Sequence, residues 1–197
     1  SYLQIIMTAF FMQYCKKISI ALALLITTML AYADEGSVAI KHASIKKEAG
    51  LYMLNADLEM SLSPEVEEAI NKGVPVEFSY QFNLVKSRKY WFDKDILEAE
   101  TSIAVSYHAL SRQYLVNHDG RQTSHEILRE AMVELVQLYD WPVFDQTAIE
   151  PDETYEATLK VKLNKSKLPK VIQVDSINTE AWTLVAEPYQ WILKKAQ

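Results

Sequence analysis

Three stretches of this chain alternate apolar and polar residues with a period of two, and this pattern constrains the fold more than any other feature. The apolar positions are the even residues of 54–62, the even residues of 76–84 and the odd residues of 155–163. Successive side chains of a β-strand point to opposite faces of a sheet, so each stretch is predicted to be a half-buried strand. The chain is therefore expected to consist mainly of β-sheet.

Composition and capping residues predict the next elements along the chain. Residues 96–109 and 113–116 contain β-branched and aromatic side chains and precede a turn at 117–120, so two more strands are expected there. Ser63 and Pro64 are typical of the start of a helix, and Gly73 is placed to end that short helix.

A longer helix is predicted in the second half of the chain. Residues 123–126 have the spacing of a capping box, apolar residues then recur at helical spacing as far as Leu138, and Trp141-Pro142 is expected to close the helix. Residues 171–174 and 182–193 are predicted as two short strands, the second limited by Pro188.

The order of these elements indicates the fold class. Strands and helices do not alternate regularly, which disfavours a doubly wound parallel sheet. We expect one mainly β domain, an antiparallel β-sandwich that is immunoglobulin-like in architecture, with one short and one longer α-helix.

The N-terminal segment has the three parts of a secretory signal peptide. Lys16 and Lys17 precede the uncharged apolar run 18–30, and the small residues Ala31 and Ala33 then frame a cleavage site. The run is shorter than the roughly 20 residues of an ordinary membrane span. We expect cleavage between Ala33 and Asp34, which leaves residues 34–197 as a single exported domain.

Two further expectations concern this segment. Met12 opens an n-region of normal composition, so residues 1–11 are expected to lie upstream of the natural start. The alternative to cleavage is a retained segment that anchors the protein, and this is the only membrane contact that the sequence predicts.

Charge and cysteine content exclude several classes of function. Removal of residues 1–33 takes away two of the 20 basic residues and none of the 26 acidic ones, which leaves a net charge of −8. This negative charge disfavours a nucleic-acid partner. The only cysteine, Cys15, lies in the segment expected to be removed, so the exported domain has no disulfide, thiolate nucleophile or cysteine metal ligand.

Aromatic residues beside cationic ones are the candidates for a binding surface. Such mixtures dominate the energetics of protein interfaces, and strand ends can converge at one end of a sandwich. The residues expected to line a contact with a partner are Arg88, Tyr90, Trp91, Tyr107, His108 and Arg112. The alternative is that the aromatics of 87–92 complete the core while Arg88 and Lys89 are only solvated.

A catalytic reading has weaker support. The competing hypothesis is an envelope hydrolase that acts on glycan or peptide, and it requires His108 within hydrogen-bond reach of Asp93, Asp95 or Glu100. No hydrolase elbow, phosphate-binding loop or dinucleotide fingerprint is present. The four histidines lack metal-ligand spacing, so neither a metal nor a cofactor is predicted.

Several motifs along the chain form one recognisable set. They are Leu58 with Leu62-Ser63-Pro64, residues 69–78, Ser106–Tyr114, Trp141-Pro142-Val143, residues 155–170, Trp182 and Trp191, and Tyr107–Tyr114 is the most specific part. Together these motifs resemble one uncharacterised family of the Gram-negative envelope, known as domain of unknown function 4390. The resemblance implies a small periplasmic domain with no assigned activity. It also implies a partner, because genes of this family often lie beside one for a membrane sensor kinase. Residues 88–92 are less basic and less tryptophan-rich than in similar sequences.

Overall fold

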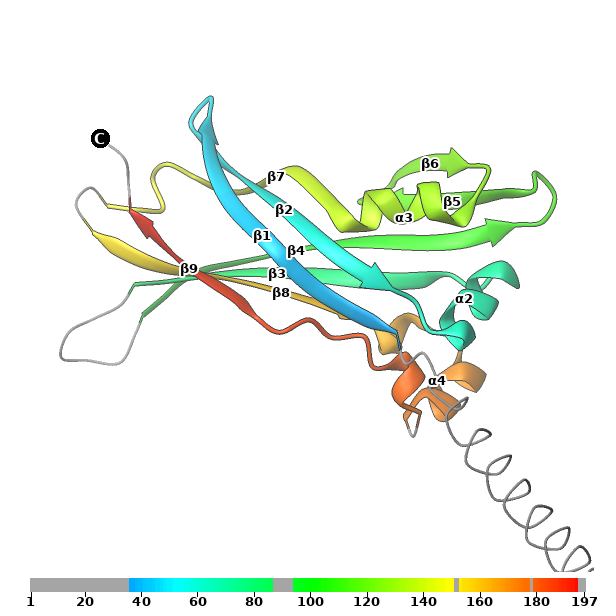
Figure 1. Cartoon of the computed structure of the whole chain (residues 1–197). Coiled ribbons are helices and arrows are strands. Elements are labelled where there is room, and N and C mark those ends of the chain that lie inside the picture. The colour runs from blue at the N-terminus through cyan, green and yellow to red at the C-terminus, as the bar shows by residue number, and fades with distance from the viewer. Residues whose placement is uncertain (1–35, 87–93, 151–152, 178, 195–197) are drawn as a thin grey trace, which may run out of the picture. The chain divides into compact units, whose positions relative to one another are not determined.

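The computed structural model describes residues 36–86, 94–150, 153–177 and 179–194 (Figure 1). The strands in these ranges are β1 (Ser37–Glu48), β2 (Leu51–Ser61), β3 (Val76–Lys86), β4 (Lys94–His108), β5 (Gln113–His118), β6 (Arg121–His125), β7 (Gln137–Asp145), β8 (Thr154–Leu163) and β9 (Tyr189–Lys194). The helices are α2 (Pro64–Asn71), α3 (Leu128–Val136) and α4 (Lys170–Ile177), with short 3₁₀ turns η2 (Lys165–Lys167) and η3 (Glu180–Trp182).

The strands form two antiparallel sheets that pack against each other. One sheet has the order β1-β2-β7, and the other has the order β6-β5-β4-β3-β8-β9. In Figure 1, β1 and β2 cross the long strands of the larger sheet at an angle. The prediction of a mainly β, antiparallel two-layer fold is confirmed, as are the strands expected from the period-two alternation.

Large side chains from the inner faces of both sheets make the core. Every second residue of β3, from Val76 to Leu84, is fully buried. The ring of Phe144 on β7 stacks on Tyr52 of β2, with ring centroids 4.6 Å apart, and lies 6.0 Å from Phe82 of β3. Phe144 therefore joins the smaller sheet to the larger one.

The short helix α2 begins and ends as its sequence predicts. The Ser63 hydroxyl accepts a hydrogen bond from the Val66 N–H at 3.3 Å, and Pro64 occupies the first turn. The same hydroxyl donates to the carbonyl of Ala181 at 2.8 Å, which ties α2 to the η3 turn. Gly73 follows the helix with φ +85°, a conformation that favours glycine.

The prediction of a longer helix after a capping box at 123–126 is wrong. Thr123 lies on the edge strand β6, where it pairs with Val116, and its hydroxyl donates to Glu134 at 2.6 Å. Helix α3 starts only at Leu128 and has nine residues. Trp141 does not close this helix but pairs with Leu54 inside β7, because burying its side chain in the core overrides the local helix signal.

The strand expected at 171–174 is also corrected, because these residues belong to helix α4. A stretch with only three apolar residues, Val171, Ile172 and Val174, does not distinguish a strand from a helix. Here the helix is started by Pro169, whose carbonyl accepts from the Ile172 N–H at 2.9 Å. The second C-terminal strand is present as β9, directly after Pro188.

Candidate functional site

Three of the six residues predicted to bind a partner lie at one end of the larger sheet. Tyr107 and His108 end β4, and Arg112 lies in the four-residue loop that leads into β5. The others, Arg88, Tyr90 and Trp91, lie outside the described residues, as do Ala31, Ala33 and Asp34 of the expected cleavage site. Lys86 and Lys94, which flank 87–93, pair with each other at the opposite end of β4, about 45 Å from Tyr107 along the strand.

The hairpin between β4 and β5 is fastened to helix α2. Tyr107 packs on Tyr114 with ring centroids 5.1 Å apart, and the Tyr114 hydroxyl donates to Oδ1 of Asn71 at 2.7 Å. Burial and the neighbouring Tyr107 raise the pKa of Tyr114, so its hydroxyl stays a donor at neutral pH. The hairpin and α2 are therefore held together as one surface.

The loop of this hairpin presents an apolar side chain to solvent. Nδ1 of His108 lies 2.9 Å from the Ser111 hydroxyl and accepts the Ser111 N–H at 3.3 Å, which closes the loop. Arg112 completes the turn with φ +55°. Leu110, at the tip between them, is 92% exposed.

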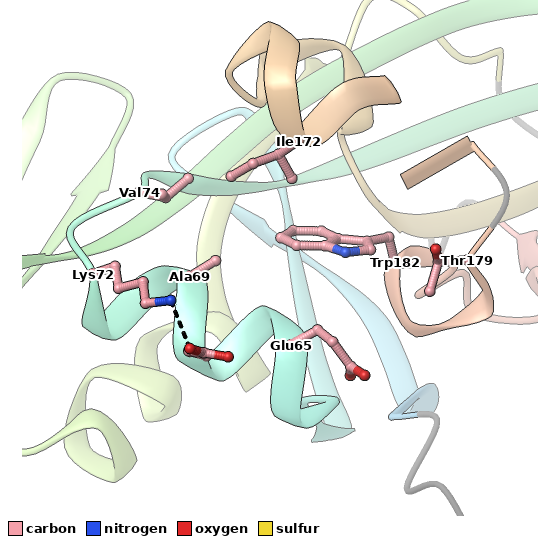
Figure 2. Close-up of a pocket in the computed structure, with 8 residues that line it drawn as sticks. Glu65, Ala69, Lys72, Val74, Ile172, Thr179 and Trp182 are labelled. Atoms are coloured by element: carbon pink, nitrogen blue, oxygen red, sulfur yellow. Dashed lines mark ion pairs between the residues drawn. The ribbon is translucent and has the colours of Figure 1, made fainter. Parts of the chain in front are cut away.

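An apolar pocket lies beside α2, where the helix faces α4 and η3 (Figure 2). Its volume is about 320 Å³. Ala69, Val74, Ile172 and the buried Trp182 line it, and Glu65, Glu68, Lys72 and Thr179 complete its wall. Lys72 donates to Glu68 at 2.6 Å and thereby lowers the pKa of that carboxyl, so Glu68 is ionised at neutral pH.

Helix α4 adds exposed apolar side chains next to this pocket. Ile172 faces inward and lines the pocket, whereas Val171 and Val174 are 78% and 67% exposed. Single exposed apolar residues are common on proteins, but several around one apolar pocket are typical of an interaction site. We name this surface the α2–α4 end: helices α2 and α4, turn η3 and the hairpin loop 109–112.

Most of this surface is not evident from the sequence. Leu110 lies inside the motif Ser106–Tyr114, but it carries neither a charge nor an aromatic ring, the two features that were taken to indicate a binding surface. The assignment of 171–174 to a strand hid the exposed face of α4. Trp182 was predicted to begin a strand, whereas it ends the turn η3. Nothing local places it against a helix more than 100 residues earlier in the chain.

The catalytic arrangement that the competing hypothesis requires is not formed by the described residues. Glu100 accepts a hydrogen bond from Ser79 at 2.6 Å and lies eight residues from His108 on the same strand, a separation of about 27 Å. Asp95 lies still farther along β4, and Asp93 is outside the described residues. Within the described ranges, no group of three or more histidine, cysteine, aspartate or glutamate side chains is arranged to hold a metal ion.

Comparison with known proteins identifies the family of this chain. A family model described as "Domain of unknown function (DUF4390)" matches residues 35–192. No protein of curated function and no solved structure matches the chain. Among the described helices, none combines the length and apolar character needed to cross a membrane.

Proposed function

Because this chain belongs to the DUF4390 family, whose function is unknown, we propose a role from the chemistry of its α2–α4 end. The domain is a non-enzymatic binding module of the periplasm, and it docks on another envelope protein through this end. A membrane sensor kinase is the partner class indicated by the family resemblance of the sequence motifs.

The observation that carries the proposal is the apolar pocket with apolar side chains exposed beside it. A pocket of about 320 Å³ lined by Trp182 and Ile172 is large enough for one or two apolar side chains of a partner. Leu110 in the β4–β5 loop and Val174 on α4 are exposed apolar side chains of the same α2–α4 end. Binding would remove all of these groups from water, which is the main driving force of protein association.

The charges around the pocket define the partner further. Helix α2 exposes Glu65, Glu67 and Glu68, and only Glu68 has a basic partner among the described residues. An acidic rim favours a partner segment that carries lysine or arginine next to its apolar anchor. We therefore propose a basic, amphipathic segment as the occupant of the pocket.

Photo-crosslinking in the cell envelope tests this proposal. A photoreactive amino acid is placed at Leu110, at Val174, or at Ile192, a control position that is 57% exposed on β9 near the opposite end of the domain. We expect the same crosslinked protein from Leu110 and Val174 and none from Ile192. Equal crosslinking from all three positions, or none from any, would overturn the proposal.

A further inference from the structure

A second cleft lies on a different part of the domain, between the β5–β6 hairpin, helix α3 and strand β7. Its volume is about 520 Å³, within the range of roughly 300–1,000 Å³ that is usual for small-molecule sites. The lining residues are His118, Asp119, Arg121, Thr123, Glu134, Tyr139, Asp140, Trp141 and Pro142. None of these residues lines the pocket at the α2–α4 end.

A bulge in β7 forms one wall of this cleft. Trp141 pairs with Leu54, and Leu138 pairs with Ala56. Two residues of β7, Tyr139 and Asp140, therefore lie opposite one residue of β2, Asn55. The bulge is held by a hydrogen bond from the Asp140 N–H to Oδ1 of Asn55 at 2.8 Å. Bulges redirect side chains out of the regular sheet. Tyr139 and Asp140, the two residues of this bulge, line the cleft.

In the wall opposite β7, two carboxylates each accept hydrogen bonds through one of their two oxygens. Oδ2 of Asp119 accepts from the Thr101 hydroxyl at 2.6 Å. Oε1 of Glu134 accepts from the Thr123 hydroxyl at 2.6 Å and lies 2.5 Å from Nε2 of His125. The second oxygen of each carboxylate has no partner among the described residues, so it is available as an acceptor.

Other polar groups of the cleft are also unpaired among the described residues. The Asp140 carboxylate and the Arg121 guanidinium have no hydrogen-bond or ion-pair partner there. Trp141 also lines the cleft, although only 7% of this residue is exposed. The cleft therefore offers free donors and free acceptors together, beside the half-exposed ring of Tyr139.

We propose that this cleft binds a saccharide. A sugar hydroxyl both donates and accepts, so a sugar can satisfy the carboxylates and the Arg121 guanidinium at once. Hydrogen bonds to ionised groups are the stronger ones, and the aromatic ring of Tyr139 gives the C–H face of a sugar an apolar contact. A simple anion would meet the three carboxylates of Asp119, Glu134 and Asp140, and an organic cation would leave the Arg121 guanidinium unpaired.

Calorimetric titration of the purified protein with maltotriose and with chitotriose tests the proposal. We expect saturable binding of at least one trisaccharide, unchanged between low and high salt because the ligand is neutral. Asp140→Asn and Arg121→Gln should each weaken binding about tenfold, since each removes a charge-assisted hydrogen bond. Asparagine tolerates the left-handed backbone at position 140, so Asp140→Asn should fold normally.

Glu187→Gln is the matched control, because Glu187 is exposed and does not line the cleft. Its affinity should equal that of the unaltered protein. The proposal is overturned if neither sugar binds at millimolar concentration, or if all three variants bind equally well. Salt-sensitive binding of argininamide in place of the sugars would instead assign the cleft to an organic cation.

Discussion

Tyr80 illustrates how single side chains connect the parts of this domain. It is fully buried on β3, and its hydroxyl donates to the carbonyl of Leu135 at 2.6 Å. Leu135 lies in the last turn of α3, where helix carbonyls lack partners within the helix. One tyrosine thus attaches α3 to the larger sheet, and burial raises the pKa of its hydroxyl far above the ordinary value.

The Tyr80→Phe variant should lose about 1–2 kcal/mol of unfolding free energy at pH 8, because the Leu135 carbonyl stays buried without a donor. The pKa of Tyr80 is higher in the folded state, so its contribution to stability is complete below the unfolded pKa of about 10 and declines above it. The difference between the two proteins should therefore shrink between pH 8 and pH 10.5 in urea unfolding. A stability difference that stays constant from pH 8 to pH 10.5 would contradict the raised pKa of the buried Tyr80 hydroxyl.

At the scale of elements, secondary structure was predicted correctly where the hydrophobic pattern was long, and incorrectly where that pattern was short. Strand β3 shows five successive inward positions, and no helix accommodates that alternation. Residues 171–174, which lie in helix α4, contain only three apolar residues. Helix α4 is stabilised by side-chain hydrogen bonds that a hydrophobic pattern does not show, such as those from the Gln173 amide to the carbonyls of Ser166 and Leu168 at 2.8 and 2.7 Å.

The junction between α2 and β4 gives a prediction at this scale. A Cβ at Gly73 would lie 3.1 Å from the Tyr107 carbonyl oxygen, whereas a Cβ at Gly120 would meet nothing within 4 Å. Both glycines have nearly the same positive φ, so the backbone strain of an alanine is similar, about 1–2 kcal/mol. Gly73→Ala should be the more destabilising of the two in thermal unfolding. Equal losses would show that α2 does not pack closely on the end of β4.

At the scale of the whole molecule, the strand order was beyond the reach of sequence patterns. Pairing of β3 with β8 joins residues about 80 positions apart, and the alternation in each strand is compatible with several partners. The candidate site shares this limitation. Tyr107, His108 and Arg112 were predicted from their chemistry, but the pocket at the same end of the domain exists only because η3 folds back onto α2.

The most direct test of partner binding at the α2–α4 end is quantitative capture from crosslinked cells. The tagged protein is compared with the double variant Leu110→Ser/Val174→Ser and with the control Ile192→Ser, and mass spectrometry measures the recovered partner. All three changes affect exposed side chains, so unfolding temperatures should differ little. We predict that the double variant recovers about tenfold less of the partner than the control does, a difference of about 1.4 kcal/mol. Equal recovery by the double variant and the control would contradict the proposed function.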